Sequence, residues 1–503
     1  MDIKRAKQEI KDSIEACLAK DEFGAYRIPP IRQRPILLMG PPGIGKTQIM
    51  EQIARECHVG LVAYTITHHT RQSAVGLPFI KEKQYGEKTY SVTEYTMSEI
   101  IASVYEKIEQ TGIKEGILFI DEINCVSETL APAMLQFLQG KTFGNQKVPE
   151  GWMIVAVGNP PEYNKSVRDF DVVTLDRLKK IDLEENFDVW KEYAYRQGIH
   201  PAVISYLELR KHHFYRVETT VDGKKFATAR GWEDLSQFIQ VYETLGKNID
   251  REVVCQYIQH EKIAKDFANY LELYYKYKAD YGVEDILKGR WNKAVLQKIR
   301  AAAFDEHLSI VSLLNGKLGE LFTECYLCDA YVSKLYQYLI HYKENKTAER
   351  IEDIWHLAER ELADLEKKEL LDRQDELIMK RVIAALERFT ICSKGEVSDA
   401  EAAFDAVKGL FQKEVDKRET SVEHTSEMLT HVFDFMEEAF GDSQEMVALI
   451  TELNANYYSI WFIKENGCDQ YYRHNKGLLF QERQQSILRE MDDIEGILNT
   501  SLK

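Results

Sequence analysis

Residues 35–47 read PILLMGPPGIGKT, an apolar run that leads directly into a glycine-rich turn. The turn satisfies the pattern G-x-x-x-x-G-K-T, and a segment with helical apolar spacing follows it. A strand, such a loop and a helix in this order are the context in which the pattern binds phosphate. The sequence therefore predicts a phosphate-binding loop made of Gly40, Pro41, Pro42, Gly43, Ile44, Gly45, Lys46 and Thr47.

The residue types of this loop each have a physical role in binding ATP with Mg²⁺. Glycines let the backbone close around phosphate, so that N–H groups and the helix N-terminus face the negative charge. Lys46 would neutralise the outer phosphates, and the Thr47 hydroxyl would be a ligand of Mg²⁺. A chance glycine turn, or a degenerate loop retained for folding, is the alternative, and it is disfavoured because every demanded position is filled.

Two carboxylates end a second apolar run. Residues 117–120, ILFI, are followed directly by Asp121 and Glu122. The carboxyl ends of parallel strands face the ligand crevice in open α/β sheets. We expect Asp121 to hold Mg²⁺ through water, and Glu122 to orient the attacking water and act as its general base. The alternative is an apolar strand that simply ends in an acidic turn.

A third apolar run, Met153–Val157, leads into Gly158, Asn159 and Pro160. The side chain of Asn159 can hydrogen-bond the γ-phosphate or the attacking water. By itself, an asparagine before a proline is usually a turn residue. The position of Asn159 after a strand that follows the acidic run favours the catalytic interpretation.

Apolar runs alternate with helical patterns through the first part of the chain, which predicts a parallel sheet with helices on both faces. Residues 77–96 alternate loosely around a turn and predict an inserted hairpin. Beyond about residue 248 nearly every segment has helical period. The expected fold is an α/β P-loop NTPase followed by an all-α C-terminal extension. The expected divisions are a nucleotide-binding core at 1–182, a helical lid with a polar hairpin at 183–248 and the helical extension at 249–503.

Composition restricts the classes of partner. The 503 residues include 82 acidic and 65 basic side chains, for a net charge of −17, so the field of the chain repels a phosphate backbone and disfavours nucleic-acid binding. No apolar run approaches the ~20 residues of a membrane span, and the charged N-terminal segment does not resemble a signal peptide. The eight dispersed cysteines are expected to be reduced thiols. We therefore expect a cytoplasmic protein.

The motifs and their order resemble the MoxR family of AAA+ ATPases over roughly residues 3–245. The diagnostic pieces are DEIN at 121–124, Asn159 with Pro160, and LDR at 175–177. The resemblance implies an AAA+ module with a sheet core and a helical lid, in an ATPase that assembles as a homo-oligomeric, hexameric ring. It also implies an arginine finger, Arg177, that reaches the nucleotide of the neighbouring subunit.

Two further arginines are candidates by the same resemblance. Arg168 is a second candidate for the subunit interface, although a lone arginine in a polar loop is more often solvated. Residues 227–232, ATARGW, match the start of the lid helix, and Arg230 would contact the γ-phosphate within its own subunit. The chain departs from the family at two positions. Ala229 stands where the family commonly has proline, which leaves the lid assignment open. Cys125 stands where the family commonly has arginine, which leaves open whether the contact of that arginine is made.

Two segments match the insertions of this clade in position, namely the hairpin at 77–96 and residues 140–151. The resemblance implies that both point toward the central pore of the ring or toward the remodelled partner. Neither segment contains an unmistakable aromatic pore signature, and Tyr85 and Phe143 are the residues to test first. Ordinary surface hairpins are the alternative.

The resemblance implies an ATP-driven machine that remodels a partner protein, typically one with a von Willebrand factor A domain, and the helical extension would recruit it. A nucleotide-gated scaffold or signalling switch with slow turnover is the alternative, against which the intact Glu122 and Arg177 argue. A nucleic-acid motor is a third reading of the motifs, and the acidic charge disfavours it.

Overall fold

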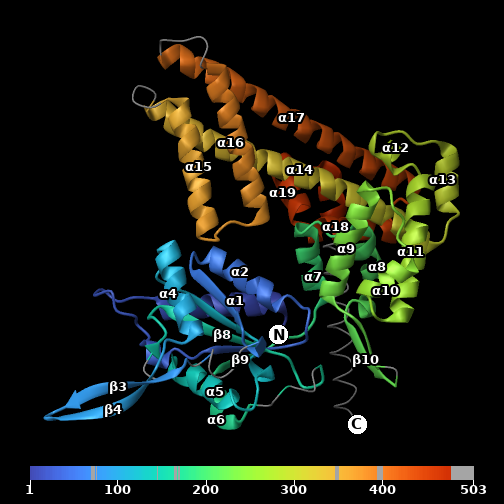
Figure 1. Ribbon diagram of the computed structural model, residues 1–503. Helices are drawn as coiled ribbons and strands as arrows, with labels where there is room; N and C mark the ends of the chain where they lie inside the picture. The colour runs from blue at the N-terminus through green and yellow to red at the C-terminus, as the bar shows by residue number, and fades with distance from the viewer. Residues whose placement is uncertain are drawn as a thin grey trace, which may run out of the picture. The chain divides into compact units, whose positions relative to one another are not determined.

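The computed structural model describes residues 1–476 except 69–73, 75, 144, 145, 164–166, 168, 169, 222, 346–349 and 394–399. The described chain divides into two compact units, whose elements are labelled in Figure 1. Unit 1 comprises Met1–Val189, Thr228–Gly231 and Glu359–Glu376, and unit 2 comprises Trp190–Ala227, Trp232–Ala358 and the chain from Leu377 onward. The three-part division expected from the sequence remains a prediction.

Unit 1 is built on a five-stranded sheet in the order β2-β5-β8-β1-β9, and every neighbouring pair is parallel. The strands are β1 (Ile36–Met39), β2 (Gly60–Thr65), β5 (Gly116–Asp121), β8 (Trp152–Gly158) and β9 (Lys179–Asp182). The central strands β5, β8 and β1 are mainly apolar and almost wholly buried, as parallel strands covered on both faces require. Because all five strands run the same way, their carboxyl ends meet at one edge of the sheet.

Helices cover both faces of this sheet. One face packs against α1 (Ile3–Leu18) and α2 (Lys46–Glu56), and the other against α4 (Glu99–Thr111) and α5 (Ala131–Gly140). Successive residues of β1 alternate between the two cores, since Leu38 belongs to the first and Leu37 to the second. The predicted parallel sheet with helices on both faces is therefore confirmed.

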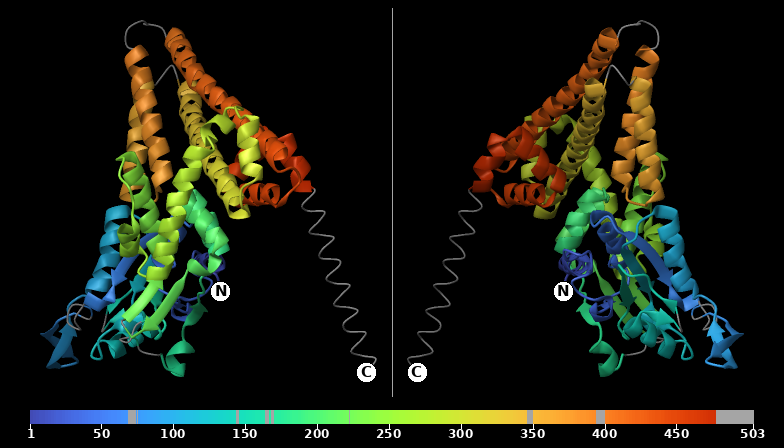
Figure 2. Two further views of the ribbon diagram at one scale, coloured as in Figure 1. Left: turned by 90° about the vertical axis from the view of Figure 1, so that its right-hand side faces the viewer. Right: turned by 90° about the vertical axis from the view of Figure 1, so that its left-hand side faces the viewer.

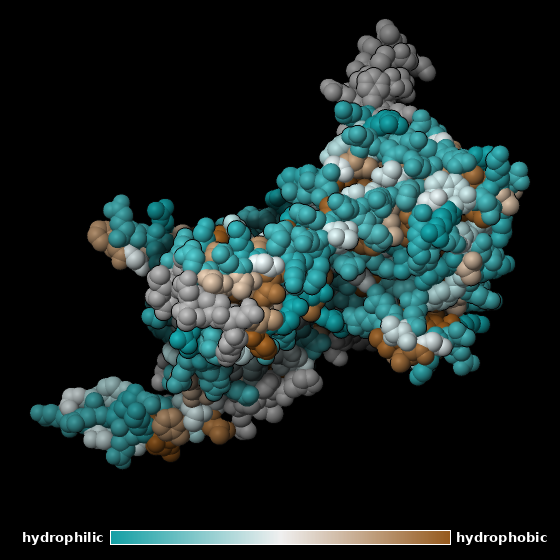
Figure 3. All heavy atoms as spheres, turned by 90° about the horizontal axis from the view of Figure 1, so that it is seen from above, coloured by the Kyte–Doolittle hydropathy of each residue, from teal (hydrophilic) through white to brown (hydrophobic). Residues whose placement is uncertain are grey.

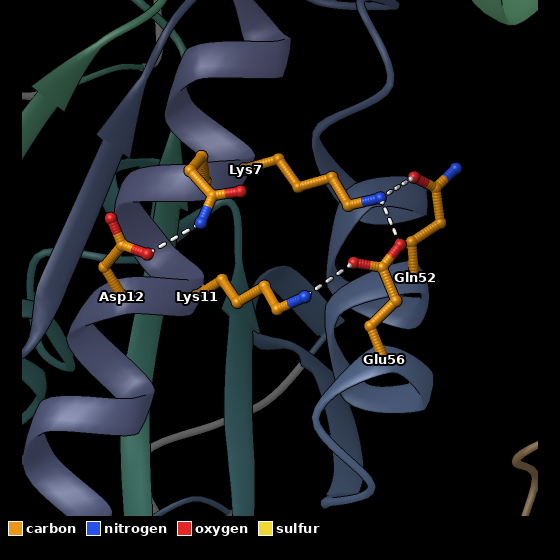
Figure 4. A network of polar contacts seen from close by, with 6 residues as sticks. Lys7, Lys11, Asp12, Gln52 and Glu56 are labelled. Carbon is orange, nitrogen blue, oxygen red and sulfur yellow. Dashed lines mark hydrogen bonds and ion pairs between the residues drawn. The ribbon is translucent and has the colours of Figure 1, made fainter.

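Polar side chains of α1 and α2 contact one another (Figure 4), and apolar side chains of both helices belong to one buried core. Lys7 Nζ donates to Gln52 Oε1 at 3.0 Å and pairs with Glu56 at 2.6 Å. Lys11 Nζ lies 3.4 Å from the same carboxylate. These contacts fix the helix whose first two residues, Lys46 and Thr47, belong to the predicted phosphate loop.

The hairpin predicted at residues 77–96 is confirmed as β3 (Pro78–Tyr85) paired with β4 (Lys88–Tyr95). The segment at 140–151 also contains a short hairpin, β6 (Thr142–Phe143) with β7 (Gln146–Lys147). Phe143 of this hairpin does not point outward. Its side chain is buried and stacks on Phe137 with ring centroids 4.1 Å apart, because β6 folds back on the apolar face of α5.

Strand β9 has no counterpart among the predicted strands. Its sequence, KKID, is mostly charged, and only Ile181 is buried. An edge strand pairs on one side only, so lysines are tolerated at positions that reach solvent. The strand conformation of β9 therefore depends on its pairing with β1 more than on an apolar sequence pattern. A short helix, α6 (Val172–Leu175), precedes it, and short 3₁₀ helices lie at Pro30–Arg32, Ile66–His68, Ile123–Cys125 and Lys211–His213.

In the described part of unit 2, the regular elements are helices and one hairpin, β10 (Arg216–Thr220) with β11 (Gly223–Ala227). None of the described helices is long and apolar enough to cross a membrane. The first lid elements are α7 (Phe187–Arg196), which begins in unit 1, α8 (Pro201–Leu209) and α9 (Ala229–Thr244). The later helices are α10 (Arg251–Tyr257), α11 (Glu261–Asp280), α12 (Val283–Leu287), α13 (Lys293–Arg300), α14 (Phe304–Asn345), α15 (Ile351–Lys367), α16 (Arg373–Ser393), α17 (Ala400–Ala439), α18 (Gln444–Ala455) and α19 (Tyr457–Asn466).

The two longest helices, α14 and α17, run along each other in unit 2 (Figure 2). Three contacts give their direction, since Asp329 pairs with Arg418, Tyr336 stacks on Phe411 and Tyr342 contacts Phe404. Along these three contacts the residue numbers of α14 increase while those of α17 decrease, so the two helices are antiparallel. Helix α17 continues without a break through its polar stretch at 417–425, where Ser421 and Thr425 contact Cys325 of α14.

Candidate functional site

The predicted phosphate loop lies at the carboxyl end of β1, directly before α2. Gly43 and Gly45 have φ angles of 77° and 90°, a backbone region that glycine enters without steric cost. A Cβ atom at Gly40 would lie 2.7 Å from Leu183 Cβ, so this position needs glycine for packing. Helix α2 has no side-chain cap, which leaves its first N–H groups available to an anion.

Lys46 links the loop to a second strand end. Its Nζ donates hydrogen bonds to Gly40 O at 2.8 Å, to Pro41 O at 2.7 Å and to Asn159 Oδ1 at 2.9 Å. The side chain is buried, and this burial lowers the pKa of Lys46 to about 8, an effect that Asp121 opposes and Arg230 reinforces. An anion beside this ammonium would therefore stabilise its charged form.

The acidic pair lies at the carboxyl end of β5. Asp121 is half-buried, and burial raises the pKa of its carboxyl group, against the opposing effects of the Glu122 N–H, Lys46 and Arg230. Glu122 N donates to Asp121 Oδ1 at 2.8 Å. The backbone of Glu122 has a φ of 56°, in the left-handed region that costs a non-glycine residue about 1–2 kcal/mol. Such strain is typical of functional sites, where the surrounding structure holds a side chain in place.

Asn159 follows β8, and the side chain of Asn124 holds its backbone through two hydrogen bonds. No role for Asn124 was predicted from the sequence. Asn124 Nδ2 donates to Asn159 O at 2.8 Å, and Asn159 N donates to Asn124 Oδ1 at 3.3 Å. Asn124 is only 2% exposed, and a Cβ atom at Gly158 would lie 2.7 Å from its Oδ1. The one sequence feature that could have identified Asn124 is its position three residues after Asp121. That Asn124 contacts the residue after β8 is seen only in the fold.

Substituting Asn124 with alanine is expected to lower ATP turnover about tenfold, because Asn159 loses the two bonds that orient it. The same change should cost about 1–3 kcal/mol of unfolding free energy, since Asn159 is left with unpaired backbone groups. Steady-state kinetics and thermal denaturation test both effects, with the loss expected in kcat more than in KM. Thr129→Ala, on the exposed turn that follows, is the matched control. Unchanged kcat in Asn124→Ala would exclude the positioning role.

Arg230 also reaches the phosphate loop. Its backbone N–H donates to Gly43 O at 3.1 Å, and Gly231 N donates to Thr228 Oγ1 at 3.2 Å. The residue is exposed, and its charge acts on both Lys46 and Asp121. The segment that the sequence analysis assigned to the second sensor therefore lies beside the loop.

Arg177 lies apart from these contacts. It follows α6, which Asp171 caps by accepting a hydrogen bond from Thr174 N at 2.7 Å. The exposed Arg177 guanidinium donates to Gln139 of α5, and no hydrogen bond or ion pair within the described residues joins it to the loop. Val172, at 81% exposure, is open to solvent beside it. Arg168 lies outside the described residues.

The donor set is compatible with Mg²⁺. Thr47 and Asp121 are both half-buried oxygen donors at strand or helix ends of this site. The described residues contain no cluster of three or more His, Cys, Asp or Glu side chains that could hold a metal by themselves. Mg²⁺ usually takes one or two protein ligands and completes its shell with water and phosphate oxygens. Thr47 and Asp121 are therefore the two residues that could hold Mg²⁺ together with a nucleotide.

Part of unit 1 matches a known protein family. Residues 36–172 match the model of the AAA family, the ATPase family associated with various cellular activities. One of 102 matching chains among solved structures is a candidate ATPase from Cytophaga hutchinsonii ATCC 33406. It is 18% identical, with a TM-score of 0.21, and the match covers 36% of this chain and 52% of that one, about half its length. No curated protein matches the sequence.

Proposed function

We propose that the AAA domain of this chain binds ATP with Mg²⁺ and hydrolyses the γ-phosphate bond. One observation carries the proposal, namely the hydrogen bond from Lys46 Nζ to Asn159 Oδ1, which joins the phosphate loop after β1 to the end of β8. Asp121, at the end of β5, and Arg230 are close enough to act electrostatically on the same ammonium. Segments distant in sequence thus supply one site with the groups that phosphoryl transfer needs.

The loop and Lys46 bind the triphosphate. The free N–H groups at the start of α2 and the Lys46 ammonium face the phosphates, and Lys46 exchanges its carbonyl partners for phosphate oxygens. Thr47 and Asp121 would hold Mg²⁺, which supplies further neutralisation of the developing phosphate charge. Arg230 adds a third positive charge from within the same chain.

Glu122 and Asn159 act on the attacking water. The Glu122 carboxylate orients this water and accepts its proton as the water oxygen bonds to the γ-phosphorus and the bond to the β-phosphate oxygen breaks. The Asn159 amide holds the γ-phosphate or the water, and Asn124 fixes its backbone. The products are ADP and phosphate.

Arg177 is proposed to complete the site of a neighbouring copy in a ring. Its exposed position after α6, away from its own loop, suits a contact between chains. The exposed Val172 and Val173 beside it are apolar groups that such a contact would cover. A head-to-tail contact of this kind uses different surfaces on the two copies and closes into a ring.

Mixing two inactive variants tests both the ATPase and its shared sites. The wild-type chain is expected to release phosphate from ATP, while Arg177→Ala and Glu122→Gln alone should be nearly inactive. In a mixture, an Arg177→Ala chain keeps its own base and receives the arginine of a Glu122→Gln neighbour, so about a quarter of the sites recover in an equal random ring. Phosphate release is the readout.

A mixture of Glu122→Gln with Lys46→Ala is the matched control. Each of these chains lacks a group that its own site needs, and a neighbouring chain cannot supply that group, so no site should recover. A mixture with Arg177→Ala that stays inactive would limit Arg177 to a local role. A wild-type chain that releases no phosphate would exclude the ATPase itself.

The finer assignment is of MoxR type, a cytoplasmic remodelling ATPase with a von Willebrand factor A domain protein as its partner. The motif resemblance supports this assignment, together with the large helical unit 2, which offers surface for recruiting a partner. The scaffold or switch with slow turnover is its alternative, and the rate of phosphate release in the mixing experiment separates the two.

A further inference from the structure

The hairpin β3–β4 stands clear of the core of unit 1. Its strands pair with each other and with no other strand in the described chain, and nearly every side chain on them is exposed. Figure 3 shows the hairpin projecting from the rest of the unit, hydrophilic along most of its length with hydrophobic side chains toward its base. An isolated two-stranded hairpin has little core of its own, so its side chains are available for another role.

The register of the hairpin divides its side chains into two unlike faces. Pairs such as Lys83 with Tyr90 and Tyr85 with Lys88 lie directly opposite each other, and alternate residues share a face. One face carries Phe79, Lys81, Lys83, Tyr85, Lys88, Tyr90, Val92 and Glu94. The other carries Pro78, Ile80, Glu82, Gln84, Thr89, Ser91, Thr93 and Tyr95. We call the first set the lysine face.

The lysine face has an excess of positive charge. Glu94 is its only acid, and it pairs with both Lys83 and Lys81, the latter at 3.5 Å. Lys88 has no acidic partner in any ion pair among the described residues. The opposite face carries one acid, Glu82, and no base. This face therefore carries a net positive charge on a chain of net charge −17, with Glu87 in the turn that joins the two strands, and its electrostatic complement is an acidic surface.

Aromatic rings lie between these lysines. Phe79, Tyr85 and Tyr90 are 43%, 59% and 51% exposed. The rings of Tyr85 and Tyr90 lie 6.0 Å apart at 57°, so they support each other and still present their outer surfaces to solvent. Lysines placed only to protect a sheet edge would not require exposed rings on the same face. The combination fits a ligand with both carboxylates and apolar side chains.

We infer that the lysine face binds an extended acidic segment of a partner protein, one that alternates carboxylate and apolar side chains. Lys81 and Lys83 are about 7 Å apart along the strand, which is the repeat of alternate side chains on an extended peptide. No described strand pairs with the outer edge of β3 or β4, so a polypeptide can add to such an edge by backbone pairing, with its carboxylates on the lysine face and its apolar side chains on the opposite face, where Ile80 is 77% exposed. A nucleic acid cannot make those backbone pairs, which favours a peptide.

Binding of a defined peptide to the full chain tests the inference. The probe is a fluorescein-labelled peptide of about ten residues that alternates aspartate with valine, followed by fluorescence anisotropy without nucleotide. The wild-type chain should bind it, and salt should weaken binding. Lys81→Gln/Lys83→Gln/Lys88→Gln should weaken it about tenfold or more.

The matched control is Lys4→Gln/Lys114→Gln/Lys276→Gln, which also lowers the net charge by three but acts on exposed lysines outside the hairpin. It should change affinity by less than about twofold, because these charges are screened from the hairpin. Equal loss in both triple variants would show that overall charge, not the lysine face, drives binding, and would overturn the inference. Thermal denaturation of both variants confirms that they are folded.

Two further probes decide the class of ligand. A peptide with lysine in place of aspartate should not bind, and equal binding would contradict the charge argument. Single-stranded oligothymidylate of similar length should bind more weakly than the acidic peptide, and tighter binding would replace the peptide with a nucleic acid. Since no step uses the nucleotide site, failure here leaves the proposed ATPase untouched, and the reverse also holds.

Discussion

Lys46→Ala is expected to lose at least about a hundredfold in ATP affinity and turnover. In the structure this ammonium is buried and binds Gly40 O, Pro41 O and Asn159 Oδ1. Alanine removes the charge that faces the outer phosphates and also breaks the link between the loop and β8. Binding of a fluorescent ATP analogue and release of phosphate measure the two losses separately.

The matched control for this prediction is Lys179→Ala. Lys179 is a half-buried lysine of the same unit that bonds Glu9 and Ser13, both at 2.6 Å, and has no part in the site. Its removal should leave nucleotide affinity near the wild-type value. If Lys46→Ala binds the analogue as tightly as Lys179→Ala does, the loop is not the nucleotide site.

Glu122→Gln is expected to bind ATP with near wild-type affinity and to hydrolyse it about a hundred to a thousand times more slowly. Glutamine keeps the size of the side chain and the bond from the residue 122 N–H to Asp121 Oδ1, but its amide cannot accept the proton of the attacking water. A single-turnover experiment, with analysis of the bound nucleotide, should find ATP rather than ADP.

Glu128→Gln is the control for the loss of a nearby carboxylate, since Glu128 is an exposed residue of the turn after the 3₁₀ helix. It should turn over ATP at the wild-type rate. Wild-type turnover in Glu122→Gln would instead assign the base to another group, and Asp121 would be the first to examine.

Much of unit 1 follows from local signals. The strands that end at Gly40, Asp121 and Asn159 are apolar over their whole length because helices bury both faces, and such runs can be read without the fold. The hairpin of β3 and β4 is read as easily, because its turn separates two alternating segments. These features predict that three strand ends meet, and the structure confirms that Lys46 joins two of them.

The remainder depends on tertiary contacts that no local pattern encodes. Strand β9 is defined by pairing with β1, and the role of Asn124 by reaching Asn159, thirty-five positions away in sequence. The sequence pattern does not show that Phe143 is buried, since this depends on its stacking against the ring of Phe137.

The proposed ATPase depends on one site, formed by the loop after β1 and the ends of β5 and β8. Its most direct test is an experimental structure of the Glu122→Gln chain with ATP and Mg²⁺. The proposal predicts the triphosphate along residues 40–47, with the γ-phosphate within hydrogen-bond reach of Lys46 Nζ and the Asn159 side chain. A nucleotide bound elsewhere, or a γ-phosphate beyond the reach of both residues, would contradict it.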